Sequence, residues 1–387
     1  MSEQVRVLVG TTKGAFILTS DESRQEWALT GPHCDLWPIN HVVGDPATGT
    51  LWAGGGGEWS GAGVWRSTDG GENWELSQMS NGSMAEWAAN DPGFAEMIGG
   101  VPPDAPFTGQ IDAIWSLCPV EDKLYAGSKP AQLFVSSDGG ATWEMTEGLA
   151  NFPERESWSP GAAGLNLHTI VPHPGNPDHM WIAISAAGVF GTEDGGSSWS
   201  RLNRRDNTHS HGQSDHPAAG DGNETGHCVH NMVRAPGGDG DILYQQNHHG
   251  VYRSNDGGRS WRDITGGLPS TFGFPIRVHP RDPMTAWTIP LNGDMEGRFP
   301  PDASAAVWKT TDGGESWKAM REGLPQEKCF FTVLRQAMAG DTQDRAGLYF
   351  GTNSGSIFAS TDEGESWTEI ARHLPTVLGV EVLETQG

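Results

Sequence analysis

The sequence predicts an all-β, seven-bladed β-propeller, and three observations support this fold class. One motif, S/T-x-D-x-G-x-x-W, recurs six times along the 387 residues, which indicates a repeat architecture. The runs between its copies are too short for helices and suit strands. The chain also contains 17 Trp and 13 Phe, whose burial requires a core, and 54 Gly and 25 Pro, which are typical of turns.

The motif marks a tight turn in each repeat. Its copies are residues 67–74, 136–143, 192–199, 254–261, 310–317 and 360–367, and a degenerate copy at 19–27 keeps the Asp and the Trp. The motif resembles the Asp-box, or BNR, repeat. This resemblance implies that the Ser/Thr and Asp side chains bond the turn backbone, that the glycines take positive φ angles and that the Trp packs between sheets.

The segments around each motif recur in the same order and predict the blades. An apolar strand, a Pro-containing turn and two strands with aromatic residues precede the tight turn, as in residues 165–199. Four-stranded units repeated around a ring form a β-propeller, which leaves only short, protected sheet edges. Residues 377–384 form a lone first strand, and the N-terminal segment supplies the three strands that it lacks. We therefore expect one domain, 1–387, whose ring is closed by both chain ends in one blade.

Three insertions indicate which face of the ring is functional. Turns between strands one and two and between strands three and four share a face with the motif, which we call the Asp-box face. The other connections lie on the opposite face, the loop face, and three of them are long: 78–110, 146–164 and 203–226. Long loops in a compact domain are usually functional.

Charge and composition exclude several classes of partner. The formal net charge is −25, which disfavours nucleic acid and anionic membranes because both require a basic surface. The chain opens without a signal-peptide pattern and has no window with the roughly 18 apolar residues of a membrane span, so we expect a cytoplasmic location. The four cysteines form no C-x-x-C pair, so neither disulfides nor a thiolate zinc site is indicated. The sequence does not specify the oligomeric state.

Five tryptophans lie outside the motif and the second and third strands of the repeats: Trp37, Trp59, Trp87, Trp115 and Trp158. Either they anchor the long loops, or they line an aromatic pocket for a sugar or another flat ligand. On the second interpretation, Trp37, Trp59 and Trp115 are substrate-binding candidates.

Three charged residues complete this predicted substrate-binding set. Lys129 and Arg277 lie at loop-face or inner-strand positions and could hold an anionic group of a ligand. Asp294 is an acidic residue of the loop face.

Four histidines form the strongest site signal. His168 and His230 occupy equivalent positions on the innermost strands of adjacent blades, and His248 and His249 lie in the next turn of the second of these blades. We expect these four, with Gln246 or Asp215 as a further candidate, to bind a divalent metal such as Zn, Mn or Fe. Two other interpretations stay open, in which the histidines bond substrate directly or satisfy loop carbonyls.

Two carboxylates are candidates for acid–base catalysis. A glycosidase needs a pair of carboxyl groups, one of them with a raised pKa. Glu58 and Asp112 are preferred because the neighbouring Trp59 and Trp115 could supply the apolar surroundings that raise a carboxyl pKa. His230 is the third predicted catalytic residue.

The repeat resemblance implies architecture rather than one activity, because Asp-box repeats occur in sialidases, xyloglucanases, sortilin-type receptors and photosystem assembly factors. The F/Y-R-I-P motif of sialidases is absent and the four tyrosines are explained as repeat core, so sialidase activity is not expected. We expect a glycoside hydrolase-like or lyase-type enzyme acting on a carbohydrate, such as an oligosaccharide, or a similar polar small molecule in a loop-face pocket. Two alternatives stay open: a non-enzymatic ligand-binding or assembly propeller, and a metal oxygenase with histidine ligands.

Overall fold

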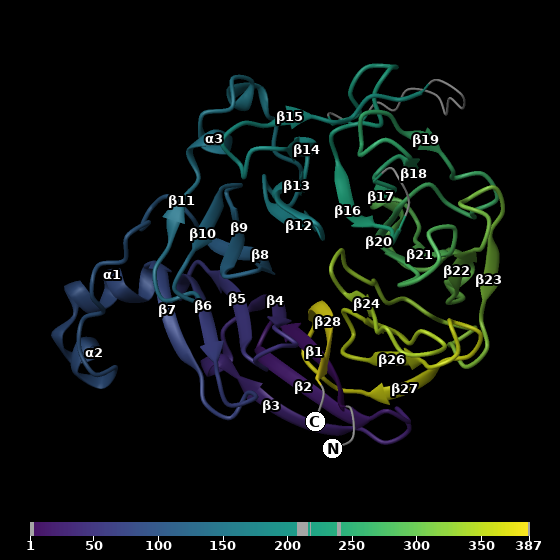
Figure 1. Cartoon of the computed structure of the whole chain (residues 1–387). Coiled ribbons are helices and arrows are strands. Elements are labelled where there is room, and N and C mark those ends of the chain that lie inside the picture. Colours follow the sequence, from purple (N-terminus) through teal and green to yellow (C-terminus); the bar gives the residue numbers. More distant parts are fainter. Residues whose placement is uncertain (1–3, 207–215, 217, 238–240, 386–387) are drawn as a thin grey trace.

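In the computed structural model the chain forms a ring of seven four-stranded sheets around a central channel (Figure 1). The structure describes residues 4–206, 216, 218–237 and 241–385. Strands dominate this described part, which contains only three short α-helices. The predicted all-β, seven-bladed propeller is therefore confirmed.

The first four blades follow one another around the ring, each written from its innermost strand outward. Blade 1 consists of β28 (Val377–Thr385), β1 (Gln4–Thr11), β2 (Gly14–Asp21) and β3 (Ala28–His33). Blade 2 consists of β4 (Ile39–Gly44), β5 (Leu51–Gly57), β6 (Gly61–Ser67) and β7 (Glu75–Ser80). Blade 3 consists of β8 (Ala113–Val120), β9 (Lys123–Lys129), β10 (Leu133–Ser136) and β11 (Glu144–Met145). Blade 4 consists of β12 (Leu167–His173), β13 (Asn176–Ile184), β14 (Gly188–Thr192) and β15 (Ser200–Arg201).

Three further blades complete the ring. Blade 5 consists of β16 (Val229–Arg234), β17 (Leu243–Asn247), β18 (Gly250–Ser254) and β19 (Arg262–Asp263). Blade 6 consists of β20 (Gly273–Val278), β21 (Ala286–Pro290), β22 (Val307–Thr310) and β23 (Lys318–Met320). Blade 7 consists of β24 (Met338–Gly340), β25 (Leu348–Gly351), β26 (Ile357–Ser360) and β27 (Thr368–Ala371).

Both chain ends lie in blade 1 and close the ring, as predicted. β28 pairs antiparallel with β1, from Gln4 opposite Thr385 to Thr11 opposite Val377. The C-terminal strand is therefore the innermost strand of the blade that the N-terminal strands complete, and the two ends emerge close together (Figure 1).

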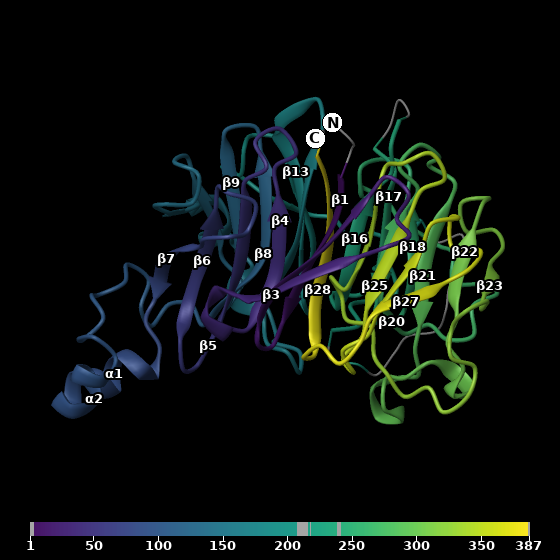
Figure 2. The ribbon, with the colours of Figure 1, turned by 90° about the horizontal axis from the view of Figure 1, so that it is seen from below.

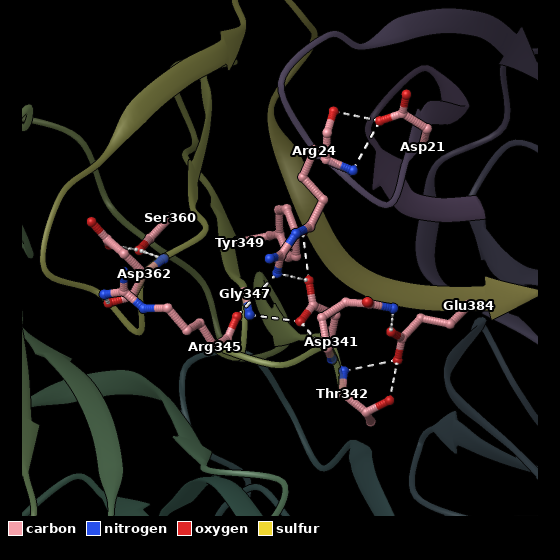
Figure 3. Close-up of polar contacts among 12 residues, drawn as sticks. Asp21, Arg24, Asp341, Thr342, Arg345, Gly347, Tyr349, Ser360, Asp362 and Glu384 are labelled. Carbon is pink, nitrogen blue, oxygen red and sulfur yellow. Dashed lines mark hydrogen bonds and ion pairs between the residues drawn. The ribbon is translucent and has the colours of Figure 1, made fainter. Parts of the chain in front are cut away.

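A polar network joins blade 1 to blade 7 on the Asp-box face (Figure 3). Arg24 forms a buried ion pair with Asp341 at 3.0 Å. The Tyr349 hydroxyl also donates to Asp341, at 2.8 Å. Glu384 of β28 accepts the backbone N–H and the hydroxyl of Thr342. These bonds tie residues from both chain ends to the last blade.

Each complete copy of the motif forms the turn that the repeat resemblance implies. In the first copy, Ser67 Oγ donates to the Asp69 carboxylate and accepts the Gly71 N–H. The same carboxylate accepts the N–H groups of Glu72 and Asn73. Gly71 has a φ of 100°, in the left-handed region that favours glycine. The Ser/Thr and Asp bonds recur at the other five complete copies.

Six innermost strands carry a β-bulge near their loop-face ends. The bulged residues are Leu378 in β28, Asn40 in β4, Trp115 in β8, His168 in β12, His230 in β16 and Phe274 with Pro275 in β20. A bulge breaks the strict alternation of a strand and re-aims one side chain. The predicted equivalence of the histidine positions in adjacent blades therefore corresponds to a repeated backbone irregularity.

The bulges of blades 2 to 6 are linked from blade to blade by side-chain hydrogen bonds, which we call inter-blade staples. Asn40 Nδ2 donates to Ile114 O (2.8 Å), Ser116 Oγ to Leu167 O (2.8 Å), His168 Nε2 to Val229 O (3.0 Å) and His230 Nδ1 to Gly273 O (2.6 Å). Each acceptor carbonyl lies immediately before the bulge of the next blade. Because a buried carbonyl without a partner is costly, the staples stabilise the packing of each blade from 2 to 5 against the next.

The long connections differ in detail from the predicted insertions. β7 continues to Ser80, and the first insertion then forms α1 (Ser83–Asn90) and α2 (Pro92–Met97), which project from the loop face (Figure 2). The second contains α3 (Glu147–Ala150). Helices form in these connections because residues outside a sheet must find partners for their backbone N–H and C=O groups within their own segment. A fourth long connection, 321–337, joins β23 to β24.

Among the described residues, no helix combines the length and the apolar character needed to cross a lipid bilayer.

Candidate functional site

Two of the predicted metal ligands belong to the scaffold. His168 is fully buried; its Nε2 donates to Val229 O and its Nδ1 faces the Thr169 hydroxyl at 2.8 Å. Gln246 donates to three backbone carbonyls and accepts from the Thr288 hydroxyl at 3.0 Å. Neither side chain has a donor atom left for a metal ion.

The remaining predicted ligands, His230, His248 and His249, come together on the loop face with two residues that were not predicted as ligands, His216 and Cys228. We call these five residues the histidine cluster. Donor atoms of His216, Cys228 and His248 all lie within 4.8 Å of one another. Cys228 Sγ lies 3.7 Å from His230 Nε2. The His248 ring is 4.1 Å from the His216 ring and 5.0 Å from the His249 ring.

Backbone contacts hold the segments of the histidine cluster in place. Cys228 immediately precedes β16, and its carbonyl accepts the His248 N–H at 2.9 Å, which fixes the β17–β18 turn beside it. His227 N–H donates to Ala218 O, and Ala219 N–H donates to His216 O. The β15–β16 connection is therefore folded back over the start of β16.

One ring nitrogen of His230 is oriented for a partner other than the protein backbone. Its Nδ1 must carry the proton, because the Gly273 carbonyl can only accept, and this leaves the Nε2 lone pair facing Cys228. A backbone carbonyl on the second nitrogen is the usual arrangement of a metal-binding histidine. His216 differs, because its Nδ1 accepts the Ala218 N–H, so its Nε2 is protonated in the neutral ring.

Burial keeps the imidazoles of the histidine cluster neutral. Desolvation lowers the pKa of His248 to about 4 and that of His249 to about 4, with nearby histidines adding to both shifts. The pKa of His230 is lowered well below its usual value, first by burial and then by the charge of Arg335. Burial raises the pKa of Cys228, so this residue is a neutral thiol near pH 7. Neutral imidazoles are the form that binds metal ions.

Asp294, a predicted substrate-binding residue, lies at the edge of the histidine cluster. It begins the 3-10 helix η3 (Asp294–Glu296) between β21 and β22, and its Oδ2 is 3.7 Å from His248 Nε2. Its Oδ1 accepts from Arg298 Nε at 2.7 Å and Nη2 at 2.6 Å. The bidentate arginine therefore largely neutralises the carboxylate that faces His248.

Residues 206–230 contain five histidines, but this segment contributes less to the site than its composition suggests. The ring of His227 turns to Glu224, at 2.5 Å, and not toward His230. His209, His211 and Asp215 lie outside the described residues. His216 and His230 of this segment lie beside His248, with ring centres 4.1 Å and 5.4 Å from its ring.

Arg335, beside the histidine cluster, was also not predicted. Arg335, in the fourth long connection, has its guanidinium 5.2 Å from the ring centre of Phe274, and its Nη2 is 3.4 Å from Ser185 Oγ. In blades 2 to 6 a proline lies in or just before the turn after the innermost strand, but the corresponding turn of blade 7, 341–347, contains no proline. The repeat pattern therefore predicts no position for Arg335. The turn of blade 7 has a different mark in the sequence, Asp341. Its carboxylate accepts the Gln343 N–H, as His173 Nδ1 accepts the Gly175 N–H in the turn of blade 4.

Arg277, another predicted substrate-binding residue, lies away from the histidine cluster. It lines a channel cavity of about 600 Å³ together with His41, Glu381 and the turns of the Asp-box face. Burial raises the pKa of Glu381, but the His41 hydrogen bond and the charge of Arg277 outweigh it, so the net shift is downward. This cavity opens toward the Asp-box face, whereas the sequence placed the pocket on the loop face.

Glu58 and Asp112 lack the surroundings predicted for a catalytic pair. Both are exposed, and among the described residues neither carboxylate has a side-chain partner. Trp59, next to Glu58, turns toward Trp87 at 5.7 Å in an edge-to-face contact. Phe94 stacks on Trp87 at 4.4 Å. These three rings, which we call the aromatic platform, leave Trp59 49% and Trp87 50% exposed on the loop face.

The other predicted substrate-binding residues lie at separate places in the ring and do not form one pocket wall. Trp37 packs edge-to-face on Trp65 at 5.7 Å, between blades 1 and 2. Trp115 is the half-buried bulge residue of β8, and Lys129 ends β9 before a cis-proline. Trp158 lies against Phe190 at 5.2 Å, so it anchors its loop.

A second group of potential ligands lies on the Asp-box face. His173, His179 and Asp241 bring donor atoms within 4.8 Å of one another. However, His173 Nδ1 accepts the Gly175 N–H and Asp241 is bonded to Arg234 at 2.8 Å. Both side chains are thereby engaged in the turns of this face.

The ring and its turns define the class of protein: the chain is a seven-bladed Asp-box β-propeller. The BNR/Asp-box repeat family matches residues 65–76. An oligoxyloglucan-reducing end-specific xyloglucanase from Emericella nidulans is 25% identical over 218 residues, which are 51% of this chain and 25% of that protein. The matched part thus spans about a quarter of the length of this relative.

Solved structures show the same fold. The GH74 xyloglucanase from Xanthomonas campestris superposes with a TM-score of 0.59 and 16% identity, covering 96% of this chain and 56% of that chain. YCF48 from Cyanidioschyzon merolae superposes with a TM-score of 0.52 and 14% identity, covering 86% of this chain and 84% of that chain. The propeller is therefore similar in fold to those of glycoside hydrolases and of other proteins.

Proposed function

We propose that the protein is a hydrolase or lyase of carbohydrates or similar polar molecules, with a metal ion bound in the histidine cluster. The observation that carries this proposal is the approach of donor atoms of Cys228 and His248 to within 4.8 Å of each other, with His230 Nε2 3.7 Å from Cys228 Sγ. A nitrogen and sulfur donor set favours zinc over manganese.

Metal coordination is the role that best suits Cys228. An activated nucleophilic cysteine has a lowered pKa and some exposure, whereas burial raises the pKa of Cys228. Its thiol loses the proton when a metal binds. Spacing alone did not indicate this site, because Cys228, His230 and His248 approach one another only through the bulge and the next hairpin turn.

The chemistry of the cluster is that of water activation. A zinc ion with an open coordination position lowers the pKa of a bound water to about 7. His230 is oriented by Gly273, and Cys228 and His248 are held by the backbone bond between them. His249 Nε2 is buried without a hydrogen-bond partner among the described residues, so it can form a hydrogen bond with a group that enters the site.

A carbohydrate ligand is supported by the aromatic platform and by the fold likeness to xyloglucanases. Trp59, Trp87 and Phe94 expose ring surface on the face that carries the histidine cluster. Aromatic rings with one wet and one apolar side are typical of sugar-binding surfaces.

An oligosaccharide panel, including xyloglucan and uronate oligomers, tests this function with protein saturated with zinc. We expect turnover that a chelator abolishes and zinc restores, and loss of turnover in His248→Gln. The exposed His373 provides the matched control, His373→Asn, which keeps a residue that tolerates its φ of 63°. Turnover that persists in the chelated protein would contradict the metal-assisted reaction.

A non-enzymatic glycan-binding propeller is the second candidate, and the exposed aromatic platform favours it. In that case, Trp87→Ala would abolish the quenching of tryptophan fluorescence by oligosaccharides, while His248→Gln would leave it unchanged and no panel member would be converted.

A further inference from the structure

Arg335 lies at the loop-face end of the central channel, on a segment that crosses it. Asn231 Nδ2 of blade 5 donates to the Arg335 carbonyl. The neighbouring Gln336 donates to His168 O of blade 4 at 2.7 Å and accepts the Val380 N–H of blade 1 at 2.7 Å. The backbone of Arg335 is therefore held from three sides, and its side chain has a defined origin.

The guanidinium of Arg335 has no acidic partner among the described residues. Within the described residues, its side-chain hydrogen bond is the long one to Ser185 Oγ, 3.4 Å, and its Nε is buried without a hydrogen bond. Elsewhere in the ring, Arg24 pairs with Asp341 at 3.0 Å and Arg234 with Asp241 at 2.8 Å. A partly buried cation without a counter-ion is unfavourable for folding.

The surroundings of Arg335 concentrate positive charge at the histidine cluster. The guanidinium lies over Phe274, whose ring is 4.7 Å from that of His230. Arg298 lies over the same phenylalanine at 5.8 Å but is paired with Asp294. Arg298 is thus paired within the site, whereas Arg335 forms no ion pair with an acidic side chain of the described residues, in a chain of net charge −25.

We propose that Arg335 binds the anionic group, a carboxylate or a phosphate, of a sugar ligand whose reacting part lies at the histidine cluster. The guanidinium fork matches the paired oxygens of either group. The proposal rests on the proposed function, and it specifies the substrate class as acidic sugars. An uncompensated cation that weakens the fold but is matched by a ligand is typical of a functional site.

Calorimetric titration with D-glucuronate, D-glucose 6-phosphate and D-glucose tests the proposal. We expect one of the two acidic sugars to bind the wild-type protein at least about tenfold more tightly than glucose, as a charge-assisted hydrogen bond provides. The tighter of the two identifies carboxylate or phosphate as the preferred group. Arg335→Gln is expected to remove the preference, and Arg335→Lys to retain part of it.

Two controls separate binding from scaffold effects. Arg277→Gln, in the channel cavity, is expected to keep the preference for acidic sugars. Without ligand, Arg335→Gln is expected to melt at or above the wild-type temperature, because it removes an unpaired cation. Equal binding of the three sugars, an unchanged preference in Arg335→Gln, or a lower melting temperature or failure to fold of this variant would overturn the proposal.

The zinc content of each sample distinguishes this proposal from the proposed function. Arg335→Gln is expected to retain the wild-type zinc content, because Arg335 donates no ligand atom. Zinc binding without a preference for acidic sugars contradicts the role of Arg335 alone. A preference for acidic sugars in a protein that binds no zinc supports Arg335 and contradicts the metal centre.

Discussion

At the scale of the residue, the Asp-box aspartates show how a short motif becomes a rigid turn. Asp312 accepts hydrogen bonds from the side chain and the N–H of Ser316 and from the Thr310 hydroxyl. The Ser316 hydroxyl makes the largest contribution to lowering its pKa, to about 2. The pKa of Asp69 is also lowered to about 2, chiefly by the Asn73 N–H.

These shifts predict how stability depends on pH. A carboxyl whose pKa is lower in the folded than in the unfolded state stabilises the fold above the unfolded value of about 3.9, and this stability is lost as the pH falls toward 2. We expect the melting temperature of the wild-type protein to fall over this interval. The difference in melting temperature between the wild type and Asp312→Asn should become smaller over the same interval.

Asp122→Asn, at an exposed turn position, serves as the control in these melting curves. It is expected to follow the wild type at every pH. A difference in melting temperature between the wild type and Asp312→Asn that stays constant down to pH 2 would contradict the role assigned to the Asp312 carboxylate.

At the scale of the element, the inter-blade staples explain part of the histidine pattern. His168 and the Nδ1 side of His230 satisfy carbonyl groups next to bulges, as Asn40 and Ser116 do. The equivalence of the two histidines therefore has a structural cause. Only His230 has a second nitrogen directed at another functional group, Cys228.

Removal of a staple should destabilise the fold by an amount set by burial. Ser116→Ala leaves the Leu167 carbonyl without its side-chain donor in the interior, which should cost about 1–3 kcal/mol in the free energy of unfolding. Ser77 Oγ makes the same type of bond to Ala141 O, but at an exposed position. Ser77→Ala should therefore cost under about 0.5 kcal/mol. Urea unfolding compares the two, and equal costs would contradict the staple.

At the scale of the whole molecule, ring closure depends on polar contacts between blades 1 and 7. Arg24 and Asp341 form a buried pair with side chains 8% and 0% exposed. Removal of one member of a buried pair leaves an uncompensated charge, so Arg24→Met should cost about 3–5 kcal/mol. Arg372 pairs with Glu369 at the surface, and Arg372→Met should cost less than about 1 kcal/mol.

Melting curves and urea unfolding measure this difference. A loss in Arg24→Met no greater than that in Arg372→Met would show that the ring closes through the β1–β28 ladder without help from this pair.

The repeat allowed the blades, the ring closure and the faces to be predicted, because six copies of one turn leave little choice of topology. The site was harder to predict from sequence. The bulge at His230, the approach of Cys228 to His248 and the crossing of the channel by Arg335 depend on backbone irregularities that periodicity does not encode. The sequence favours Glu58 as a catalytic carboxylate because Trp59 follows it, but the Trp59 ring packs on Trp87 and not on Glu58.

The most direct test of the account is the zinc content of the purified protein after incubation with zinc and extensive dialysis, measured by mass spectrometry. The histidine cluster predicts one zinc per chain in the wild type and in His373→Asn, and its loss in Cys228→Ser and His248→Gln, with all four proteins folded. A folded wild-type protein that retains no zinc, or a Cys228→Ser variant that retains the full amount, would contradict the metal centre.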